Sequence, residues 1–279
     1  MAQKVVHGDD LLYRFFLDLF ASEPELFARV PRLIIESMAI WLPLDVYKRF
    51  PALLPWVVRD PTCRGDKSKG IPDQWGAPNA DGYLRDDNSL VKSLPRALAV
   101  HGPAGSRVHG SRMGTEFVAS HIWRKVDHAD LASRVPLLNT FVPNIVWLPS
   151  QVAKLSDLEG GIVQQTLQAM SRSIYGRANV DEHLREVVTD AWGLLPPPPT
   201  AVVDEVDLDR LNWFVSTSRF FATRKGRLAT VLRALETLDA NEPIEQKVIT
   251  TRYGDGLHLV DPLRRNLLEQ YLARFTESG

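Results

Sequence analysis

Apolar residues at helical spacing dominate the N-terminal part of the chain. Between residues 9 and 21, the apolar side chains that share a helical face are Leu11, Leu12, Phe15, Phe16, Leu19 and Phe20. Asp9 and Asp10 precede them, and carboxylates favour a helix N-terminus. The pattern predicts a helix over 9–21, a second from about 22 towards 41 that Pro31 can break, and a third over about 44–54. Residues 1–56 are therefore expected to form a helical region.

The next part of the chain has no regular period. Residues 57–90 scatter Gly and Pro among Asp, Arg and Lys residues, as in a long loop. Loops of this length are usually functional or disordered, and Trp56, Trp75 and Tyr83 favour an ordered one. A solvated linker is the alternative for this irregular region, 57–100.

Two short runs in the centre have the composition of strands. They cover 115–123 and 144–149, and both are rich in β-branched and aromatic residues. Ser150 then opens a predicted helix over about 151–174, whose middle is weakened by Gly160 and Gly161. Region 101–178 thus has the order strand, loop, strand, helix.

The C-terminal region, 179–279, again has helical periodicity. It predicts helices at about 180–192, 205–222 and 224–239, and a short hairpin near 253–256. It also predicts a last helix whose apolar face consists of Leu263, Leu267, Leu268, Tyr271, Leu272 and Phe275. Four prolines, 196–199, form a stiff spacer after the first of these helices. The fold class expected is mainly α, with a small central α+β core flanked by helical regions.

Composition limits the function classes. The net charge of −1 argues against a protein that coats nucleic acid through bulk positive charge, so any DNA contact must come from local patches. Cys63 is the only cysteine, which excludes an intrachain disulfide and a zinc site with several thiolates. No stretch has the length and apolarity of a secretory signal or a membrane span, so a cytoplasmic protein without membrane contact is expected.

His121 lies at the end of the first predicted strand. Hydrolysis of a phosphodiester needs an activated water, and a histidine with an ordinary pKa of about 6.5 can accept the proton near neutral pH. Asn144, at the start of the second strand, can fix the loop between them. A lone histidine in a strand is more often a hydrogen-bonded structural residue, and this alternative stays open.

The segments 117–123, FVASHIW, and 143–149, PNIVWLP, resemble the core of HNH endonucleases. The resemblance covers about 40 to 60 residues and implies a ββα-metal core. It implies that His121 activates water, that Asn144 stabilises the core, and that the following helix helps to hold one divalent cation, Mg²⁺ or Mn²⁺.

The chain departs from the family pattern at two positions. Ser120 stands where an acidic metal ligand usually precedes the histidine, and Ala153 stands at the third motif position. The metal-ligand candidates are therefore Ser120, Gln151 and Asp157, with Glu116 and Asp127 as further ones. Either the ligands come from elsewhere in the chain, or the site no longer cuts.

Several basic residues are candidates for contacts with DNA phosphates. Arg107 and Arg112 lie in a Gly-rich stretch, 102–114, that leads towards the first strand, and Arg124 follows His121. A second basic group, at the junction of two predicted C-terminal helices, includes Arg224, Lys225 and Arg227. Solvated surface arginines are the alternative for both groups.

The resemblance predicts a restriction-type or defence endonuclease that cuts double-stranded DNA, as a homodimer matching palindromic sites. The alternative is a non-catalytic helical DNA-binding or adaptor protein that retains a degenerate HNH core. A rival nuclease interpretation uses Glu245, Lys247 and Asp239 as the metal-site residues of a different fold.

Overall fold

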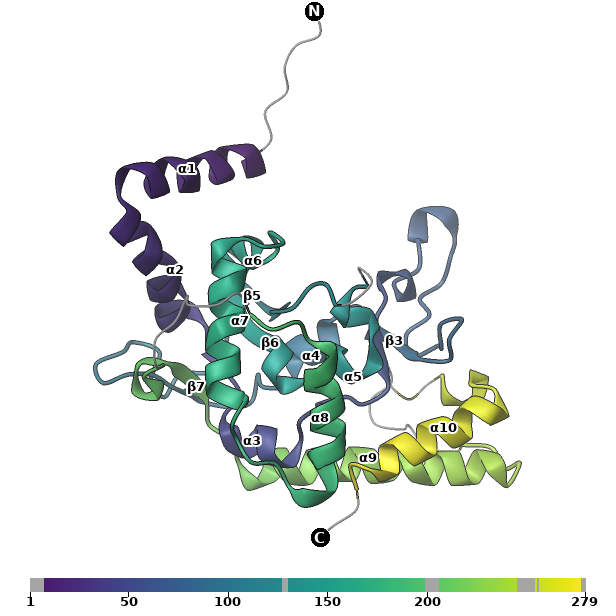
Figure 1. The fold of residues 1–279 in the computed structure, drawn as a ribbon. Helices are drawn as coiled ribbons and strands as arrows, with labels where there is room; N and C mark the ends of the chain where they lie inside the picture. The colour runs from purple at the N-terminus through teal and green to yellow at the C-terminus, as the bar shows by residue number, and fades with distance from the viewer. Residues whose placement is uncertain (1–7, 127–129, 199–205, 245–253, 255, 277–279) are drawn as a thin grey trace, which may run out of the picture.

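The computed structural model describes residues 8–126, 130–198, 206–244, 254 and 256–276. It is a mixed α+β fold in which helices predominate (Figure 1). Its helices are α1 (Gly8–Ser22), α2 (Pro24–Met38), α3 (Leu44–Arg49), α4 (Ser89–Ser93), α5 (Pro136–Asn139), α6 (Ser150–Ser156), α7 (Ile162–Tyr175), α8 (Arg185–Leu194), α9 (Ser218–Asp239) and α10 (Pro262–Ala273). Its strands are β1 (Ile40–Trp41), β2 (Val57–Arg59), β3 (Leu84–Asp86), β4 (Val100–His101), β5 (Phe117–His121), β6 (Ile145–Pro149) and β7 (Asn212–Phe214). The expected combination of many helices with a few short strands is confirmed.

The larger sheet of the described chain has the order β4-β7-β1-β6-β5. β5 pairs antiparallel with β6 along its length, with His121 opposite Ile145. β1 lies antiparallel to β6 and parallel to β7. Residues 145–148 of β6 are buried throughout, as expected for a strand covered on both faces. Because β1, β5 and β7 come from distant parts of the chain, the sheet joins the N-terminal, central and C-terminal regions.

The N-terminal helices differ in detail from the sequence prediction. α2 passes through Pro31 without a break and ends at Met38, so the prediction that it runs on towards Trp41 is wrong. Residues 40–41 instead form β1, and the Trp41 side chain is fully buried. The third helix is also shorter than predicted, because α3 ends at Arg49. Two residues of strand are too few to leave a periodic signal in the sequence.

The helix predicted over 224–239 lies within α9, whereas the helix predicted over 205–222 is wrong for the residues before Ser218. β7 occupies residues 212–214, and one continuous helix, α9, follows, with Thr217 accepting a hydrogen bond from the Phe220 N–H at its start. The Asn212 side chain donates to carbonyl groups at the end of α2, including those of Glu36 and Ala39, each 3.2 Å away. These long-range bonds hold β7 beside β1, and no local pattern encodes them.

The predicted helix over 151–174 is divided at the glycine pair. α6 ends at Ser156 and α7 begins at Ile162, and Gly160 between them has φ +71°, a left-handed conformation that favours glycine. In the C-terminal region, α8 begins at Arg185 after a 3₁₀ turn over Glu182–Leu184. Of the hairpin predicted near 253–256, residues 253 and 255 lie outside the described residues.

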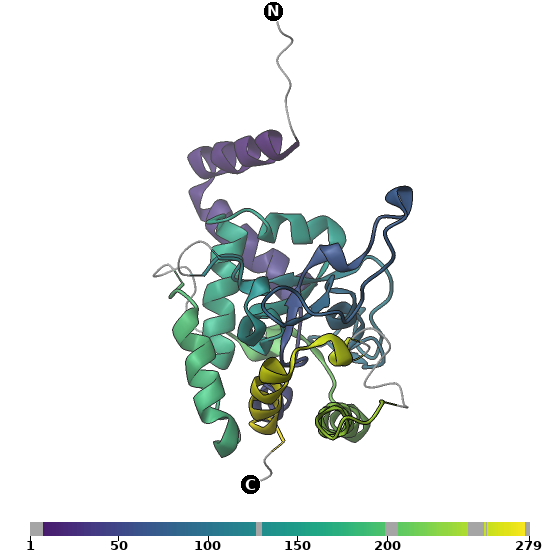
Figure 2. The same ribbon diagram turned by 90° about the vertical axis from the view of Figure 1, so that its right-hand side faces the viewer.

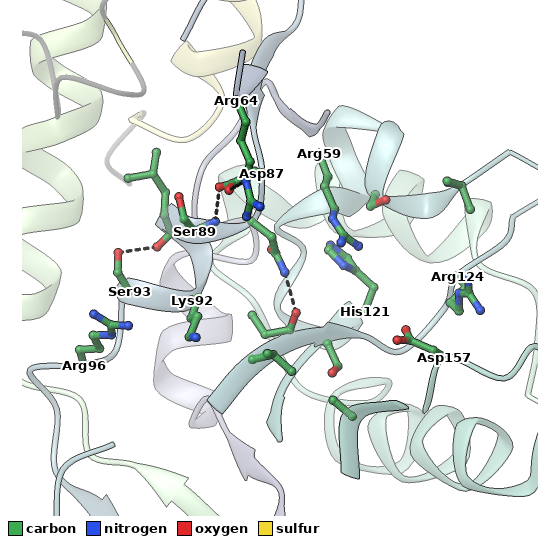
Figure 3. Close-up of a pocket in the computed structure, with 18 residues that line it drawn as sticks. Arg59, Arg64, Asp87, Ser89, Lys92, Ser93, Arg96, His121, Arg124 and Asp157 are labelled. Atoms are coloured by element: carbon green, nitrogen blue, oxygen red, sulfur yellow. Dashed lines mark hydrogen bonds and ion pairs between the residues drawn. The ribbon is translucent and has the colours of Figure 1, made fainter. Parts of the chain in front are cut away.

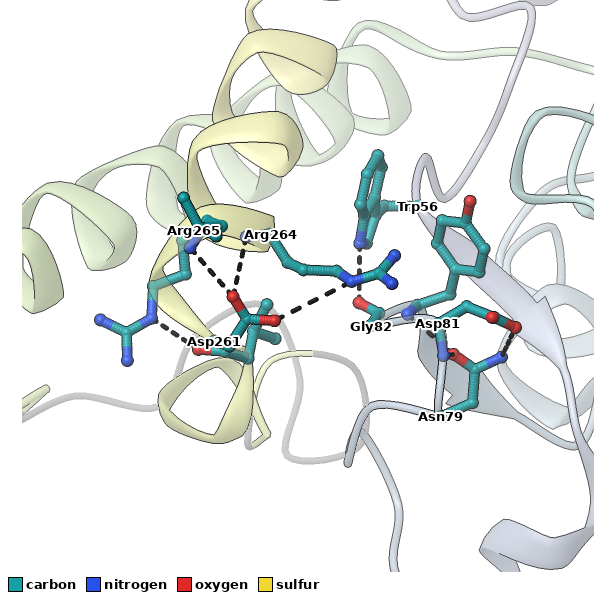
Figure 4. A network of polar contacts seen from close by, with 10 residues as sticks. Trp56, Asn79, Asp81, Gly82, Asp261, Arg264 and Arg265 are labelled. Atoms are coloured by element: carbon teal, nitrogen blue, oxygen red, sulfur yellow. Dashed lines mark hydrogen bonds and ion pairs between the residues drawn. The ribbon is translucent and has the colours of Figure 1, made fainter.

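The irregular region after residue 56 is ordered and paired. β2 lies parallel to β3, and the Trp56 indole donates to the Gly82 carbonyl at 3.0 Å. α10 packs over this turn, and Figure 4 shows the Arg264 side chain lying across Gly82. Gly82 has φ +82°, and a Cβ there would come within 2.4 Å of the Arg264 Cδ. The C-terminal helix therefore covers the region that carries β2 and β3.

α1 projects from the rest of the fold and continues into α2, as both views show (Figures 1 and 2). α7 and α8 lie to one side of the sheet, while α9 runs along the base. Tyr175 of α7 and Trp147 of β6 are fully buried between these layers. Within the described ranges, no helix combines the length and the apolarity that crossing a membrane requires.

Candidate functional site

His121 ends β5 at one edge of the sheet. A segment over 122–144 follows, then β6, and α6 begins directly at Ser150. α6 packs against both β5 and β6. The order strand, loop, strand, helix that the sequence predicts is therefore present around His121, and its strands belong to the larger sheet.

A pocket of about 890 Å³ opens in front of His121 (Figure 3). Its walls come from β2, the segment from β3 to α4, β5, and one face of α6. Its basic side chains are Arg59, Arg64, Lys92, Arg96 and Arg124, and its carboxylates are Asp87 and Asp157. Arg64 forms an ion pair with Asp87. The other four basic side chains have no ion pair with any described residue, so the pocket carries excess positive charge.

The His121 ring has a defined tautomer. Its Nε2 lies 2.8 Å from the Asn139 carbonyl oxygen and 3.2 Å from the Asn139 side-chain oxygen, both of which only accept. The Asn139 amide nitrogen donates to the Val57 carbonyl, which fixes the side-chain oxygen towards His121. Nε2 therefore carries the proton, and Nδ1 keeps its lone pair with no partner among the described residues.

The same ring is neutral at physiological pH. Burial lowers the pKa of His121 to about 4, and the nearby Arg59 guanidinium acts in the same direction, while the hydrogen bonds to Asn139 oppose both. Figure 3 shows the Arg59 guanidinium beside the His121 ring. Nδ1 can thus accept a proton at neutral pH, although a conjugate acid of such low pKa makes it a weak base.

A second buried titratable group, Asp86, lies behind the wall of the pocket that α4 forms. Asp86 ends β3, and its carboxylate accepts from the Leu90 N–H at 3.2 Å, at the start of α4. Burial raises the pKa of Asp86 to about 6, and the charge of the adjacent Asp87 contributes. Asp87 accepts from the Ser89 N–H at 3.0 Å. Two consecutive carboxylates therefore fix α4 at the rim of the pocket.

These two groups predict opposite pH dependences of stability. Below pH 6.5 the unfolded chain protonates at His121 before the folded chain does, so the free energy of unfolding falls as the pH falls towards 4, by roughly 1.4 kcal/mol per pH unit. Asp86 binds its proton in the folded chain near pH 6 and in the unfolded chain near 3.8, so its contribution rises over the same range. The two contributions largely cancel in the wild type.

Substituting His121 or Asp86 separates their two contributions to the pH dependence of stability. In Asp86→Asn, the acid-side loss of stability should be steeper than in the wild type, because only the His121 contribution remains. In His121→Gln, stability should rise as the pH falls from 6 to 4. Urea unfolding curves at half-unit steps of pH measure both effects. Parallel pH profiles for all three proteins would contradict these assignments.

Asn144 lies beneath the pocket and not in it. It is fully buried, and its side-chain oxygen accepts from the Trp123 N–H at 2.8 Å. Its amide donates to the Leu138 carbonyl at 3.1 Å. Asn144 thus connects Trp123, near the start of the segment that follows His121, to Leu138 further along it.

The candidate metal ligands do not gather into one site. Ser120 and Asp157 line the pocket, as does Ala153, whereas Gln151 is exposed on α6 outside the lining. Glu116 accepts a hydrogen bond from Ser150, and Asp127 lies outside the described residues. In the described part of the chain, no three His, Cys, Asp or Glu side chains meet as metal ligands would. Of the candidate ligands in the described lining, Ser120 and Asp157 supply one hydroxyl and one carboxylate, a smaller set of oxygens than a divalent cation usually binds.

The basic residues predicted to contact DNA are dispersed. Arg124 lines the pocket, but Arg107 and Arg112 belong to the segment after β4, at the opposite edge of the sheet. Arg224, Lys225 and Arg227 lie along the continuous helix α9 and are absent from the pocket's described lining. Arg224 is only 5% exposed and faces the Phe220 ring.

No family model, curated protein or solved structure matches the chain. Its function must therefore be inferred from the geometry of the His121 pocket. The rival site at Glu245 and Lys247 lies outside the described residues, and Asp239 forms an ion pair with Arg265 at 3.9 Å.

Sequence reasoning missed one wall of the pocket. Three of its basic residues come from the region that was expected to be a loop: Arg59, Lys92 and Arg96. Asn139, the hydrogen-bond partner of His121, is not among the predicted site residues. The available signal was weak: Lys92 and Arg96 are spaced by four residues, as on one face of a helix. The structure places Lys92 on α4 and Arg96 in the turn after it, and nothing local indicates that this segment faces His121.

Proposed function

We propose that the chain is an endonuclease that hydrolyses phosphodiester bonds of double-stranded DNA, with Nδ1 of His121 as the general base. One observation carries the proposal: a neutral histidine of fixed tautomer lines a pocket in which four basic side chains lack an ion pair among the described residues. A phosphate is the anion that such a pocket suits in a nucleic acid.

The residues divide into two roles. Arg59 and Arg124 would offset the charge of a phosphate bound near His121, and Nδ1 would take the proton of the attacking water. Asn139 would hold the ring in the tautomer that leaves Nδ1 free. In this scheme the segment β5-β6-α6 serves as the ββα core that the sequence resemblance implies, and no step is assigned to a metal.

A restriction or defence role, a cytoplasmic location and a homodimer are parts of the same proposal. They follow from the sequence resemblance and from the two-fold symmetry of palindromic DNA sites. The pocket does not bear on them.

A second candidate is a nucleic-acid-binding protein that does not cut. Ser120 and Ala153 occupy the two positions where the resembling family carries metal-ligand or motif residues, and both line the pocket. The low pKa of His121 also makes it a weak base. A pocket of this kind could bind a phosphate without activating water.

Supercoiled plasmid incubated with the full chain tests both candidates. Parallel reactions contain Mg²⁺, Mn²⁺ or a chelator, and a gel-shift assay on the same DNA measures binding. The endonuclease proposal expects nicked or linear plasmid. Binding without cleavage in every reaction supports the second candidate, and the loss of both activities overturns both.

A further inference from the structure

The pocket has two basic ends. His121, Arg124 and Asp157 lie at one end, and Lys92 and Arg96 lie at the other (Figure 3). Between them, the Arg64 guanidinium is paired with Asp87, which neutralises the middle of the wall. The unpaired positive charge is therefore concentrated at two separate places in one cavity.

The end of the pocket that contains Lys92 and Arg96 is joined by hydrogen bonds to β5, which carries His121, and to the neighbouring strand β6. The Asn88 amide, just before α4, donates to the Ala119 carbonyl of β5 at 2.6 Å. The Trp147 indole of β6 donates to the Lys92 carbonyl at 3.3 Å. α4 is thus joined to β5 at its start and to β6 near its end, so Lys92 keeps a fixed place relative to His121. Arg96 lies in the turn after α4, and its backbone N–H donates to the Ser93 carbonyl at 3.2 Å.

These basic side chains are available to a ligand. Neither Lys92 nor Arg96 forms an ion pair with a described residue, and Arg96 is exposed while Lys92 is half-buried. Basic groups that converge on a cavity repel one another, and a bound anion relieves this repulsion. A volume of about 890 Å³ leaves room for more than one phosphate group.

The lining also indicates which part of a nucleic acid enters. It contains no Phe, Tyr or Trp among the described residues. Pockets that hold an unstacked base commonly place it against such rings. The pocket is therefore suited to the sugar-phosphate backbone.

We infer that Lys92 and Arg96 form a second phosphate subsite, which binds another phosphate of the same DNA strand whose scissile phosphate lies near His121. This inference rests on the proposed function. A strand held at both ends of the pocket would lie in one register relative to His121, so α4 and the turn after it would position the bond to be cut.

The test is the salt dependence of DNA affinity, measured with a labelled duplex in a chelator so that binding is read without cleavage. Each phosphate contact contributes about 0.9 to the slope of log Kobs against log salt. The double variant Lys92→Gln/Arg96→Gln should reduce the slope by about 0.9, and Arg59→Gln/Arg124→Gln should do the same. The matched control is Arg29→Gln/Arg177→Gln, which removes two exposed basic groups outside the lining and should leave the slope unchanged.

The outcomes separate the inference from the proposed function. If Arg59→Gln/Arg124→Gln lowers the slope and Lys92→Gln/Arg96→Gln does not, the second subsite is wrong and the proposed function stands. If neither variant lowers it, both are wrong. If only Lys92→Gln/Arg96→Gln lowers it, the two-phosphate arrangement is overturned. Circular dichroism and a thermal melt verify that each variant is folded.

Discussion

His121→Ala is expected to lower the rate of DNA cleavage by about 10²–10⁴-fold, which corresponds to roughly 3–5 kcal/mol of activation free energy. A general base acts on the barrier and not on the binding of the ground state, so DNA affinity should change little. His121 is buried and bonded to Asn139, and alanine would remove that bond. His121→Gln is the companion variant, because its amide can still donate a hydrogen bond to Asn139 while offering no comparable base.

The pH profile of cleavage adds a second readout. Because the pKa of His121 is about 4, the neutral base is already present at pH 6, and the rate should not show the rise near pH 6.5 typical of an ordinary histidine. Single-turnover cleavage from pH 5 to 8 measures this. If both His121 variants cut as fast as the wild type, the base assignment is wrong and the Glu245 interpretation leads.

The parts of the fold that sequence reasoning predicted are those with a local cause. β5, β6 and the helix after them lie where β-branched runs and a helix-starting serine predict them. β1 and β7 were missed because they are short and are held by distant partners, such as the bonds from Asn212 to the end of α2. A window of neighbouring residues contains no trace of such contacts.

The residues of the candidate site also divide into those with a local sequence signal and those placed only by the tertiary fold. His121 and Asn144 were identified because both flank strands with a recognisable pattern. Arg59 and Lys92 were not, because they come from a region where glycine and proline erase periodicity and only the tertiary fold turns them towards His121. The burial of Arg224 in α9 has a related explanation, since a cluster of charges in the sequence does not indicate which basic side chain the fold buries.

Asn144→Ala is expected to lower the free energy of unfolding by about 2–4 kcal/mol. It leaves the buried Trp123 N–H without its partner, which costs roughly 1–3 kcal/mol, and it removes one of the hydrogen bonds to the Leu138 carbonyl, which costs about 0.5–1.5 kcal/mol. Urea unfolding at pH 7 measures the loss. Asn266→Ala is the matched control, since that asparagine is exposed on α10, and it should change stability by no more than about 0.5 kcal/mol.

The same substitution should impair function in a way that differs from His121→Ala. The segment that Asn144 fastens carries Arg124 and Ser133 into the pocket and places Asn139 beneath His121. Loosening it should therefore weaken DNA binding and slow cleavage together, at temperatures where the variant is still folded. An Asn144→Ala protein that is destabilised but binds and cuts normally would show that this segment is not needed to organise the pocket. An unchanged unfolding free energy would show that the two buried hydrogen bonds contribute little.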